Sequence, residues 1–249
     1  MNETERRLES ARFSDLTRRA ARSGGPVFSD FLDPDARERL CAMARREGLE
    51  IGIYGGCPDA ERAVVGLWQL GREPEGSPIE VVCLKWDGRY AAPQHRDVLG
   101  AYLGLGLERE TLGDIRLKDN EAYLAVLPAM AAYLAANLSS VGRAGVKVSY
   151  ADGPMPEAEQ GARAVINVPS LRLDAVLAQT LHLARAKAQA LIKGGAVRFN
   201  WQECCRVDVE VADGDVLSVR GQGRVKVRAV QGESRKGRLF IEVETFLRP

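Results

Sequence analysis

The side chains that most often perform catalysis or bind metals are sparse in this sequence. It contains two histidines and five cysteines, and the cysteines are scattered without a CxxC pair. Neither set has the spacing of a zinc site or of a nucleophile with its base. The sequence therefore predicts reduced thiols, no metal, no cofactor and no enzymatic activity.

Two glycine-rich stretches begin the phosphate-binding pattern GxGxxG without completing it. In the stretches that begin at Gly104 and Gly221, the third glycine is replaced by Arg109 and Lys226. Close approach of the backbone to a pyrophosphate depends on these glycines. We therefore predict no dinucleotide site.

The clearest chemical signal is a concentration of basic residues near the C-terminus. The chain has a net charge of +1, but residues 170–249 have a balance of +5 and residues 1–169 a balance of −4. Between Ser218 and Arg238 seven bases accompany one acid, Glu233. Such an excess is typical of a surface that binds a polyanion, and a solvated basic surface is the alternative interpretation.

The elements expected around these bases form a small C-terminal domain. Ser170 is the expected N-cap of a helix over 171–180, and a second helix over 184–193 should end at Gly194. Short strands are expected over 196–201, 206–211, 216–220, 224–230 and 239–246. Helical and strand periodicity then predict one basic face opposite the apolar side chains. Its members are Arg172, Arg185, Lys187, Lys193 and Arg198.

Three further residues of this region have possible roles at such a face. Asp174 either pairs with a nearby arginine and orients it, or lies near a helix N-terminus where the helix dipole favours an anion. Asn200 is expected to meet a phosphate or a 2′-hydroxyl. For Trp201, stacking on a base and local packing are equally open.

The middle of the chain predicts a ferredoxin-like sandwich. Strands are expected over 79–86, 112–117, 122–127 and 146–150, and helices over 95–103 and 128–138, which is a βαββαβ order. This order resembles an RNA-recognition motif, but the paired aromatic residues that stack bases are absent, and Tyr123 is the lone candidate. We expect a spacer or docking module, in which Arg96, Arg109 and Arg116 are candidate phosphate contacts.

The N-terminal part predicts a mixed helical and strand module. We expect a basic helix over 1–25, a helix from Pro34 to Arg46 capped by Asp33, a strand over 49–54 and a helix over 59–70. Breaker-rich segments at 71–78 and 151–160 suggest domain boundaries. The predicted fold is therefore α+β and multidomain: an N-terminal α/β module over 1–75, a ferredoxin-like domain over 76–160, and a C-terminal domain over 168–249 with a small β extension.

No stretch reads as a secretory signal or a membrane span. The first 25 residues have no apolar core, and the most apolar run, 122–138, is interrupted by Pro128. We therefore expect a cytoplasmic protein without a membrane partner.

A series of short motifs near the C-terminus resembles a known RNA-binding domain. The series is Arg172-Leu-Asp174, then Ala184-Arg-Ala-Lys-Ala188, then residues 191–200 (LIKGGAVRFN), then Asp213-Gly-Asp-Val216. It resembles the domain named after the fourth small-subunit ribosomal protein, here called the S-four domain. The resemblance implies RNA binding by this domain. One departure is Ala184, because the family has a serine there that caps the second helix.

Motifs outside this domain extend the resemblance over most of the chain. Residues 31–34, 55–62, 95–101, 104–109, 112–115, 218–224 and 232–238 resemble the bacterial YlmH-type S-four proteins. That resemblance implies a cytoplasmic role on the large ribosomal subunit, with contacts to ribosomal RNA and transfer RNA during rescue of stalled nascent chains, a form of ribosome-associated quality control. DNA is not an expected partner.

The function predicted from the sequence is non-enzymatic binding of structured RNA. The residues expected to contact RNA are Arg172, Arg185, Lys187, Lys193, Arg198, Asn200, Arg220, Arg224, Lys226, Arg228, Lys236 and Arg238. One alternative is an RNA-modifying enzyme, of the pseudouridine synthase or methyltransferase type, that uses an S-four domain for targeting. The other alternative is a protein-binding adaptor, whose basic run is masked by neighbouring acids.

Overall fold

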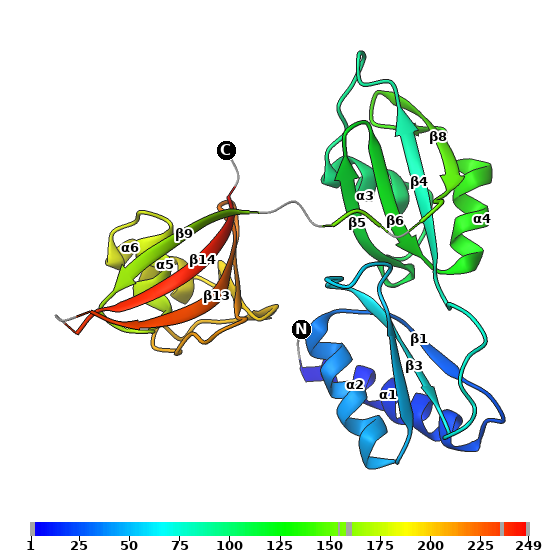
Figure 1. Cartoon of the computed structure of the whole chain (residues 1–249), viewed down its shortest axis with the longest axis horizontal. Coiled ribbons are helices and arrows are strands. Elements are labelled where there is room, and N and C mark those ends of the chain that lie inside the picture. The colour runs from blue at the N-terminus through cyan, green and yellow to red at the C-terminus, as the bar shows by residue number, and fades with distance from the viewer. Residues whose placement is uncertain (1–2, 154, 158–160, 235–236, 248–249) are drawn as a thin grey trace. The chain divides into compact units, whose positions relative to one another are not determined.

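The chain folds into two compact units in a computed structural model, Met1–Ala158 and Glu159–Pro249 (Figure 1). The structure describes residues 3–153, 155–157, 161–234 and 237–247. Within these ranges no helix is both long and apolar enough to cross a membrane. The two units are described separately below.

The N-terminal lobe of the first unit packs two helices on a three-stranded sheet. Its helices are α1 (Glu3–Arg22) and α2 (Pro34–Arg46), and its strands are β1 (Val27–Leu32), β2 (Glu50–Tyr54) and β3 (Ala63–Trp68), in the order β1-β3-β2. Asp33 caps α2 as predicted, because its carboxylate accepts the backbone N–H of Ala36 at 2.9 Å. Phe13, Leu40 and Leu67 lie in the core between helices and sheet.

The helix predicted over 59–70 is wrong, and strand β3 occupies this segment. All six residues of β3 are buried, because it is the central strand and is covered on both faces. Such a strand is a continuous apolar run, which periodicity does not separate from a buried helix. The glycine pair Gly55-Gly56 is therefore a turn between two strands and not the start of a helix.

The second lobe confirms the predicted βαββαβ order. Its elements are β4 (Glu80–Trp86), α3 (His95–Gly104), the short 3₁₀ helix η1 (Arg109–Thr111), β5 (Leu112–Lys118), β6 (Glu121–Val126), α4 (Pro128–Asn137), β7 (Ser140–Val141) and β8 (Ala144–Tyr150). The antiparallel sheet has the order β5-β6-β4-β8-β7. Its first four strands have the order of a ferredoxin-like sandwich, and α3 and α4 share its core with Leu84 and Leu124.

The two lobes of the first unit share a hydrophobic cluster. Phe31 and Val64 of the N-terminal lobe pack with Ala125 of β6 and with Met155, which follows the second lobe. Tyr123 is partly buried against the same cluster. The sheet face that stacks bases in an RNA-recognition motif is therefore partly occupied by protein.

The second unit consists of a six-stranded antiparallel sheet with two short helices (Figure 1). Its elements are β9 (Ala162–Val168), α5 (Leu173–Thr180), α6 (Arg185–Lys193), β10 (Val197–Phe199), β11 (Gln202–Glu203), β12 (Val216–Val219), β13 (Gly223–Glu233) and β14 (Leu239–Leu247), and the strand order is β11-β10-β12-β13-β14-β9. Leu177 and Ile192 of the helices pack with Leu217, Val225 and Ile241 of the sheet in one core. The two helices therefore cover one face of the sheet.

Three details of this unit differ from the sequence-based expectations. Strand β9, which lies outside the predicted range 168–249, pairs with β14 and completes the sheet. Ser170 is not the N-cap of α5, because the helix begins at Leu173 with Arg172 as its cap residue. Segment 206–211 is not a strand, and its carbonyl groups at Val209 and Val207 instead accept the first backbone N–H groups of α5.

Candidate functional site

A buried carboxylate organises the start of the two helices in the second unit. Asp174 lies in the first turn of α5 and has 0% exposed surface. Its Oδ2 accepts hydrogen bonds from Arg185 Nε at 3.0 Å and Gln189 Nε2 at 2.6 Å, and its Oδ1 accepts from Arg185 Nη2 at 3.1 Å and Arg172 Nε at 3.2 Å. These four bonds use all the acceptor positions of a carboxylate. The first of the two interpretations of Asp174 is therefore confirmed: it pairs with arginines and orients them.

The electrostatics keep this carboxylate ionised. Burial by itself would raise the pKa of Asp174, but the hydrogen bonds from Arg185, Gln189 and Arg172 outweigh it and hold the pKa well below its usual range. The same contact raises the pKa of Arg185. The side chains of Arg172 and Arg185 stay 38% and 48% exposed, so each presents N–H groups to solvent while its hydrogen bond to Asp174 fixes its position.

Further bases extend this surface along α6. Lys187 and Lys193 are exposed on α6, and Arg220 is exposed just after β12. The backbone N–H of Arg220 donates to the carbonyl of Ala196 at 2.9 Å, which places it beside the segment that follows Lys193. We call Arg172, Arg185, Lys187, Lys193 and Arg220 the helical-side basic set.

The prediction that Arg198 belongs to the same face is wrong. Its neighbours Val197 and Phe199 pack in the core with α5 and α6, so the alternation of a strand directs Arg198 away from the helices. The same reasoning applies to Arg224 and Lys226, because Val225 and Val227 lie in that core. The predicted contact residues therefore lie on two opposite faces of the sheet.

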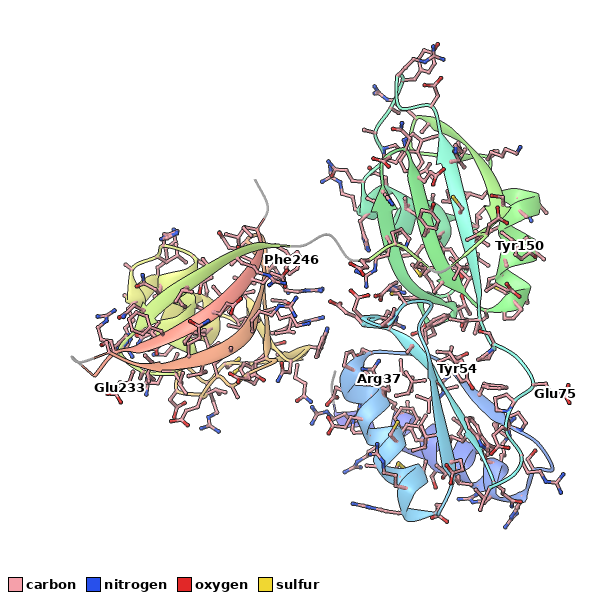
Figure 2. The ribbon with its side chains drawn as sticks, viewed as in Figure 1. Arg37, Tyr54, Glu75, Tyr150, Glu233 and Phe246 are labelled. Atoms are coloured by element: carbon pink, nitrogen blue, oxygen red, sulfur yellow. The ribbon has the colours of Figure 1, made fainter. Side chains whose placement is uncertain are left out.

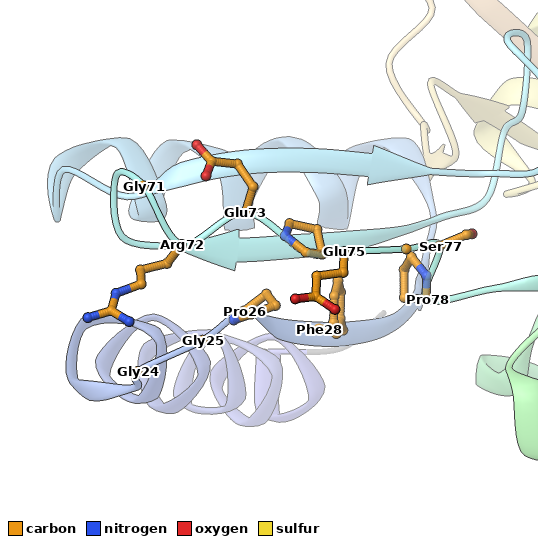
Figure 3. A pocket seen from close by; sticks show the side chains of 12 residues that line it. Gly24, Gly25, Pro26, Phe28, Gly71, Arg72, Glu73, Glu75, Ser77 and Pro78 are labelled. Atoms are coloured by element: carbon orange, nitrogen blue, oxygen red, sulfur yellow. The ribbon is translucent and has the colours of Figure 1, made fainter.

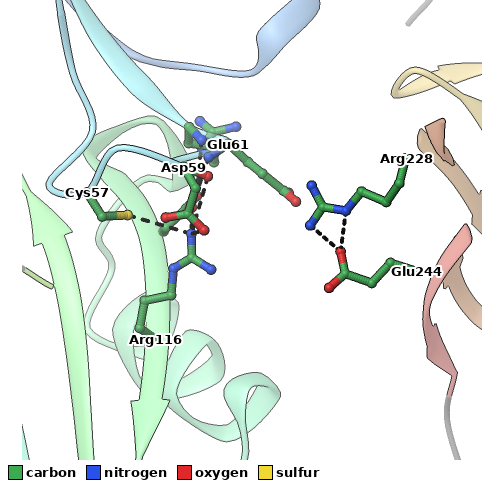
Figure 4. A network of polar contacts seen from close by, with 8 residues as sticks. Cys57, Asp59, Glu61, Arg116, Arg228 and Glu244 are labelled. Atoms are coloured by element: carbon green, nitrogen blue, oxygen red, sulfur yellow. Dashed lines mark hydrogen bonds and ion pairs between the residues drawn. The ribbon is translucent and has the colours of Figure 1, made fainter. Parts of the chain in front are cut away.

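Arg228 on β13 is engaged by a second buried carboxylate. It donates to Glu244 Oε2 from Nε at 2.8 Å and also from Nη2, and Glu244 is only 1% exposed (Figure 4). Arg228 itself remains 36% exposed at its side chain. Each face of the sheet thus has one buried acid that holds an arginine in place.

Two predicted contact residues have structural bonds within the second unit, and one falls outside the structure. Asn200 has a positive φ of 46°, and its amide binds Asp215 Oδ1 and the backbone N–H of Val216, both at 2.8 Å. Arg238 donates to the Oδ1 and, at 2.6 Å, to the carbonyl oxygen of Asn167. Lys236 lies outside the described residues.

Arg109 and Arg116 of the first unit are bound within the protein, which disfavours their predicted contact with phosphate. Arg109 donates to the carbonyls of Leu112 and Gly113, and burial, with the nearby Arg62 charge, lowers its pKa to about 10. Arg116 has a side chain 15% exposed and donates to Asp114 Oδ2 at 3.1 Å and to Cys57 Sγ at 3.6 Å (Figure 4).

The same region joins the two lobes. Asp114 accepts the backbone N–H of Glu61 at 2.9 Å and that of Arg62 at 3.0 Å, and Arg62 Nε donates to the carbonyl of Leu112 at 3.2 Å. Charge-assisted bonds of this kind are stronger than neutral ones. Together with the shared hydrophobic cluster they hold the two lobes as one body. The sequence contained no signal for this contact, since its partners are separated by about 50 residues.

Other potential sites are weak. Among the described residues no group of three or more His, Cys, Asp and Glu is placed to hold a metal ion. An open depression in the first unit is lined by residues 24–26, Phe28 and residues 71–78 (Figure 3). Its walls are mostly loop residues, including prolines and glycines. Its charged side chains are one base, Arg72, and two acids, Glu73 and Glu75. This depression has no feature that selects a ligand.

The fold and the site thus define a class: a multidomain α+β protein whose C-terminal unit displays arginines held by buried carboxylates. Known proteins agree with this class. A family model described as the putative RNA-binding domain in YlmH matches residues 74–153, which correspond to the second lobe. Ribosome-associated protein quality control protein P2 of Bacillus subtilis (strain 168) is 33% identical over 221 residues, which cover 87% of this chain and 86% of that protein.

A solved structure shares the fold. Cell division protein ylmH from Streptococcus pneumoniae aligns with a TM-score of 0.53 and 20% sequence identity, and the match covers 61% of this chain and 93% of that one. The chain belongs to the YlmH family, which includes ribosome-associated protein quality control protein P2.

Proposed function

We propose that this protein binds structured RNA on the ribosome through the helical-side basic set of its second unit. The observation that supports this most strongly is Asp174, fully buried, holding Arg172 and Arg185 at the surface. A guanidinium fixed in this way is preorganised for phosphate, since less side-chain entropy is lost when it binds.

The S-four resemblance supports the same surface. Arg172-Leu-Asp174 and Arg185, which belong to the S-four signature, are the residues that the structure brings together in this cluster. We therefore propose that the second unit is an S-four domain. Its exposed lysines and arginines contact phosphates and release counterions, so recognition is mainly of RNA shape.

The ribosome is the proposed location of this RNA. A relative that aligns over most of its own length is named a ribosome-associated protein quality control protein. We propose the same association for this chain, with ribosomal RNA and transfer RNA of the large subunit as ligands and a cytoplasmic role in the rescue of stalled nascent chains.

The second lobe is proposed to add phosphate contacts to the same RNA. The matching family model describes this lobe as a putative RNA-binding domain. Lys118, Lys85 and Lys147 are exposed and lie in one row of paired residues across β5, β6, β4 and β8, in which the fourth member is Glu121. These lysines, and not Arg109 or Arg116, are the candidate contacts there.

We propose that the chain binds RNA without modifying it. The pairings among its described strands are antiparallel, whereas a doubly wound sheet that binds a nucleotide cofactor is mostly parallel. Incubation of ribosomal RNA with the protein and S-adenosylmethionine, followed by mass spectrometry of nucleosides, should show no new modified base. A modified base would overturn this part of the proposal.

The RNA surface is tested with the double variant Lys187→Ala, Lys193→Ala, which leaves the Asp174 bonds intact. A matched control is Arg45→Ala, Arg46→Ala, two exposed bases at the end of α2. Affinity for an RNA hairpin is measured against salt concentration. We expect weaker binding and a salt slope reduced by about 2 for the lysine variant only. Unchanged affinity and slope would overturn the assignment of this surface.

Ribosome association is tested by co-sedimentation of the full chain with purified large subunits. We expect the wild type and the Arg45→Ala, Arg46→Ala control to pellet with the subunits, and the Lys187→Ala, Lys193→Ala variant to pellet less. A wild type that stays in the supernatant at low salt would contradict the proposed location.

A further inference from the structure

The sheet of the second unit has a face that points away from α5 and α6. Residues on this face alternate along each strand with core residues, for example Lys226 between Val225 and Val227 on β13. We call it the outer sheet face. Its members include Arg163, Val165 and Asn167 on β9, Arg198 on β10, Glu203 on β11, Ser218 on β12, Arg224, Lys226 and Arg228 on β13, and Phe240, Glu242, Glu244 and Phe246 on β14.

Two aromatic side chains are exposed on this face. Phe240 is 37% exposed and Phe246 is 36% exposed, and both lie on β14. Phe246 is labelled in Figure 2. Val165 of the neighbouring strand is 57% exposed. The six-residue separation of the two rings along β14 corresponds to about 20 Å, which separates them as two independent platforms.

Bases surround the aromatic residues in register. Arg224 is paired directly with Phe246 across β13 and β14, and Arg198 and Arg224 are both paired with Ser218 of β12. One row of the face therefore runs from Arg198 through Ser218 and Arg224 to Phe246. Neighbouring strands lie about 4.8 Å apart, so the backbone of Arg224 lies one strand from that of Phe246 and the backbone of Arg198 lies about 14 Å from it along the same row.

The next row contains the buried carboxylate. Glu244 accepts the Arg228 guanidinium and the backbone N–H of Gly161 at 3.1 Å, and its Oε1 lies 4.0 Å from Arg163 Nε. Lys226 is paired with Glu244 across the strands. Glu244 is only 1% exposed, so these partners cover its carboxylate, while the side chains of Arg163 and Arg228 remain 54% and 36% exposed.

We propose that the outer sheet face binds a single-stranded segment of RNA, with bases stacked on Phe246 and Phe240 and phosphates bound by the neighbouring bases. The face has five basic residues against three acids, and one of those acids is buried under Arg228. Aromatic rings interleaved with positive charge are typical of surfaces that bind single strands of nucleic acid. This inference rests on the proposed function and adds a second RNA surface opposite to the helical-side basic set.

The geometry separates the two surfaces by the thickness of the domain. The helices cover the inner face of the sheet, so an RNA bound to Arg185 and Lys187 leaves Phe246 accessible within this unit. A double-stranded stem suits the helical side, because its bases are stacked internally and offer only phosphates and hydroxyls. An unpaired strand suits the outer face, because its bases are free to stack.

The test compares two probes on the full chain: a short oligouridylate and a blunt RNA hairpin with a minimal loop. The key variant is Phe246→Leu, which removes the ring and keeps apolar bulk, and Phe246→Tyr restores a ring. Leu103→Ala is the matched control, since it alters an apolar residue that is 42% exposed on α3 and lies outside the outer sheet face and the helical-side basic set. Thermal unfolding of each variant checks that the domain stays folded.

We expect Phe246→Leu to weaken oligouridylate binding roughly 10-fold and to leave hairpin binding unchanged. Phe246→Tyr should restore the affinity, and Leu103→Ala should have little effect. Lys226→Gln should weaken oligouridylate binding and reduce its salt dependence. The Lys187→Ala, Lys193→Ala variant should show the opposite preference and lose hairpin binding.

The possible failures are distinguishable. If the wild type binds both probes and Phe246→Leu changes neither affinity, the outer sheet face is not an RNA surface and the proposed function stands. If Phe246→Leu loses ribosome association while both RNA affinities are unchanged, the occupant is a protein and the inference is overturned. If the wild type binds neither probe, the proposed function and this inference both fail.

Discussion

Arg185 donates two hydrogen bonds to Asp174, through Nε at 3.0 Å and Nη2 at 3.1 Å, and Asp174 has no exposed surface. The two residues begin α6 and α5, so this contact fixes the relative position of the two helices. It also fixes the guanidinium at the surface where RNA is proposed to bind. Stability and function therefore depend here on one pair.

Replacement of Asp174 by asparagine should affect both properties. Asp174→Asn removes the charge that Arg172 and Arg185 face and places an amide N–H group against their donors, although both arginines keep access to solvent. The expected loss is about 1–3 kcal/mol in the free energy of unfolding of the second unit, together with weaker hairpin binding. Urea unfolding and amide hydrogen exchange over α5 and α6 measure it. The control is Asp208→Asn, which alters an exposed ion pair with Arg206 and should cost less than about 1 kcal/mol.

The stability of the second unit should depend on pH through the same carboxylate. The pKa of Asp174 is lower in the folded chain than in the unfolded chain, where it is about 3.9. A carboxyl group with a depressed folded pKa contributes stability that is present above the unfolded pKa and is lost as pH falls toward the folded value. The wild type should therefore lose stability progressively below about pH 5.

Comparison with Asp174→Asn isolates this contribution. The variant cannot titrate at this position, so its unfolding free energy should fall less steeply between neutral and acid pH. Urea unfolding of both proteins over a series of buffers gives the two slopes. Equal slopes would show that Asp174 does not carry the predicted pH dependence.

The contact between the two lobes of the first unit should depend on Asp114. In the wild type the Asp114 carboxylate accepts the backbone N–H groups of Glu61 and Arg62. Asp114→Asn places an amide N–H group against one of these two donors. We expect a loss of about 1–3 kcal/mol in the stability of the first unit and faster hydrogen exchange at these two amides. Asp59→Asn serves as the comparison, because Asp59 is 48% exposed and its contact with Arg116 is longer, at 3.4 Å. An unchanged exchange rate in Asp114→Asn would show that the contact does not hold the lobes.

Helix α6 should be stabilised by a serine at its N-cap. Ala184 has the extended backbone of a cap residue, with φ −61° and ψ 139°, but no side-chain oxygen to accept an N–H group. Ala184→Ser supplies that oxygen and should raise the stability of the second unit by about 1 kcal/mol. Ala186→Ser, which places a serine at the second residue of α6, should give no gain in stability. Thermal unfolding distinguishes the two variants, and equal melting temperatures would contradict the cap argument.

The sequence predicted the second lobe well because its elements carry local signals. Pro128 opens α4, breakers bound each strand, and Asp119 lies in the turn between β5 and β6 with a positive φ of 53°. The predicted helix over 59–70 failed for the opposite reason. β3 is buried on both faces, because Val65 and Leu67 pack against α1 and α2 and Val64 packs against Ala125 of the second lobe, which no local pattern reports.

The candidate site shows the same division. The motifs singled out Arg172, Asp174 and Arg185, but left open whether Asp174 pairs with an arginine or interacts with a helix dipole, and they gave no sign of Gln189. That Asp174 is buried beneath these arginines depended on packing between α5 and α6. The assignment of Arg198 to the helical face was wrong because the direction of a strand residue is set by which side of the sheet the helices cover.

The sequence by itself thus determined most of the local elements, the concentration of basic charge and the motifs that contain Arg172, Asp174 and Arg185, because these follow from neighbours along the chain. Only the tertiary structure decided which bases are held by buried acids, as Arg228 is by Glu244. It also divided the basic residues between two opposite faces and drew Arg109 and Arg116 into the interior of the first unit. These outcomes depend on contacts between distant segments, whose energies appear only when the chain is folded.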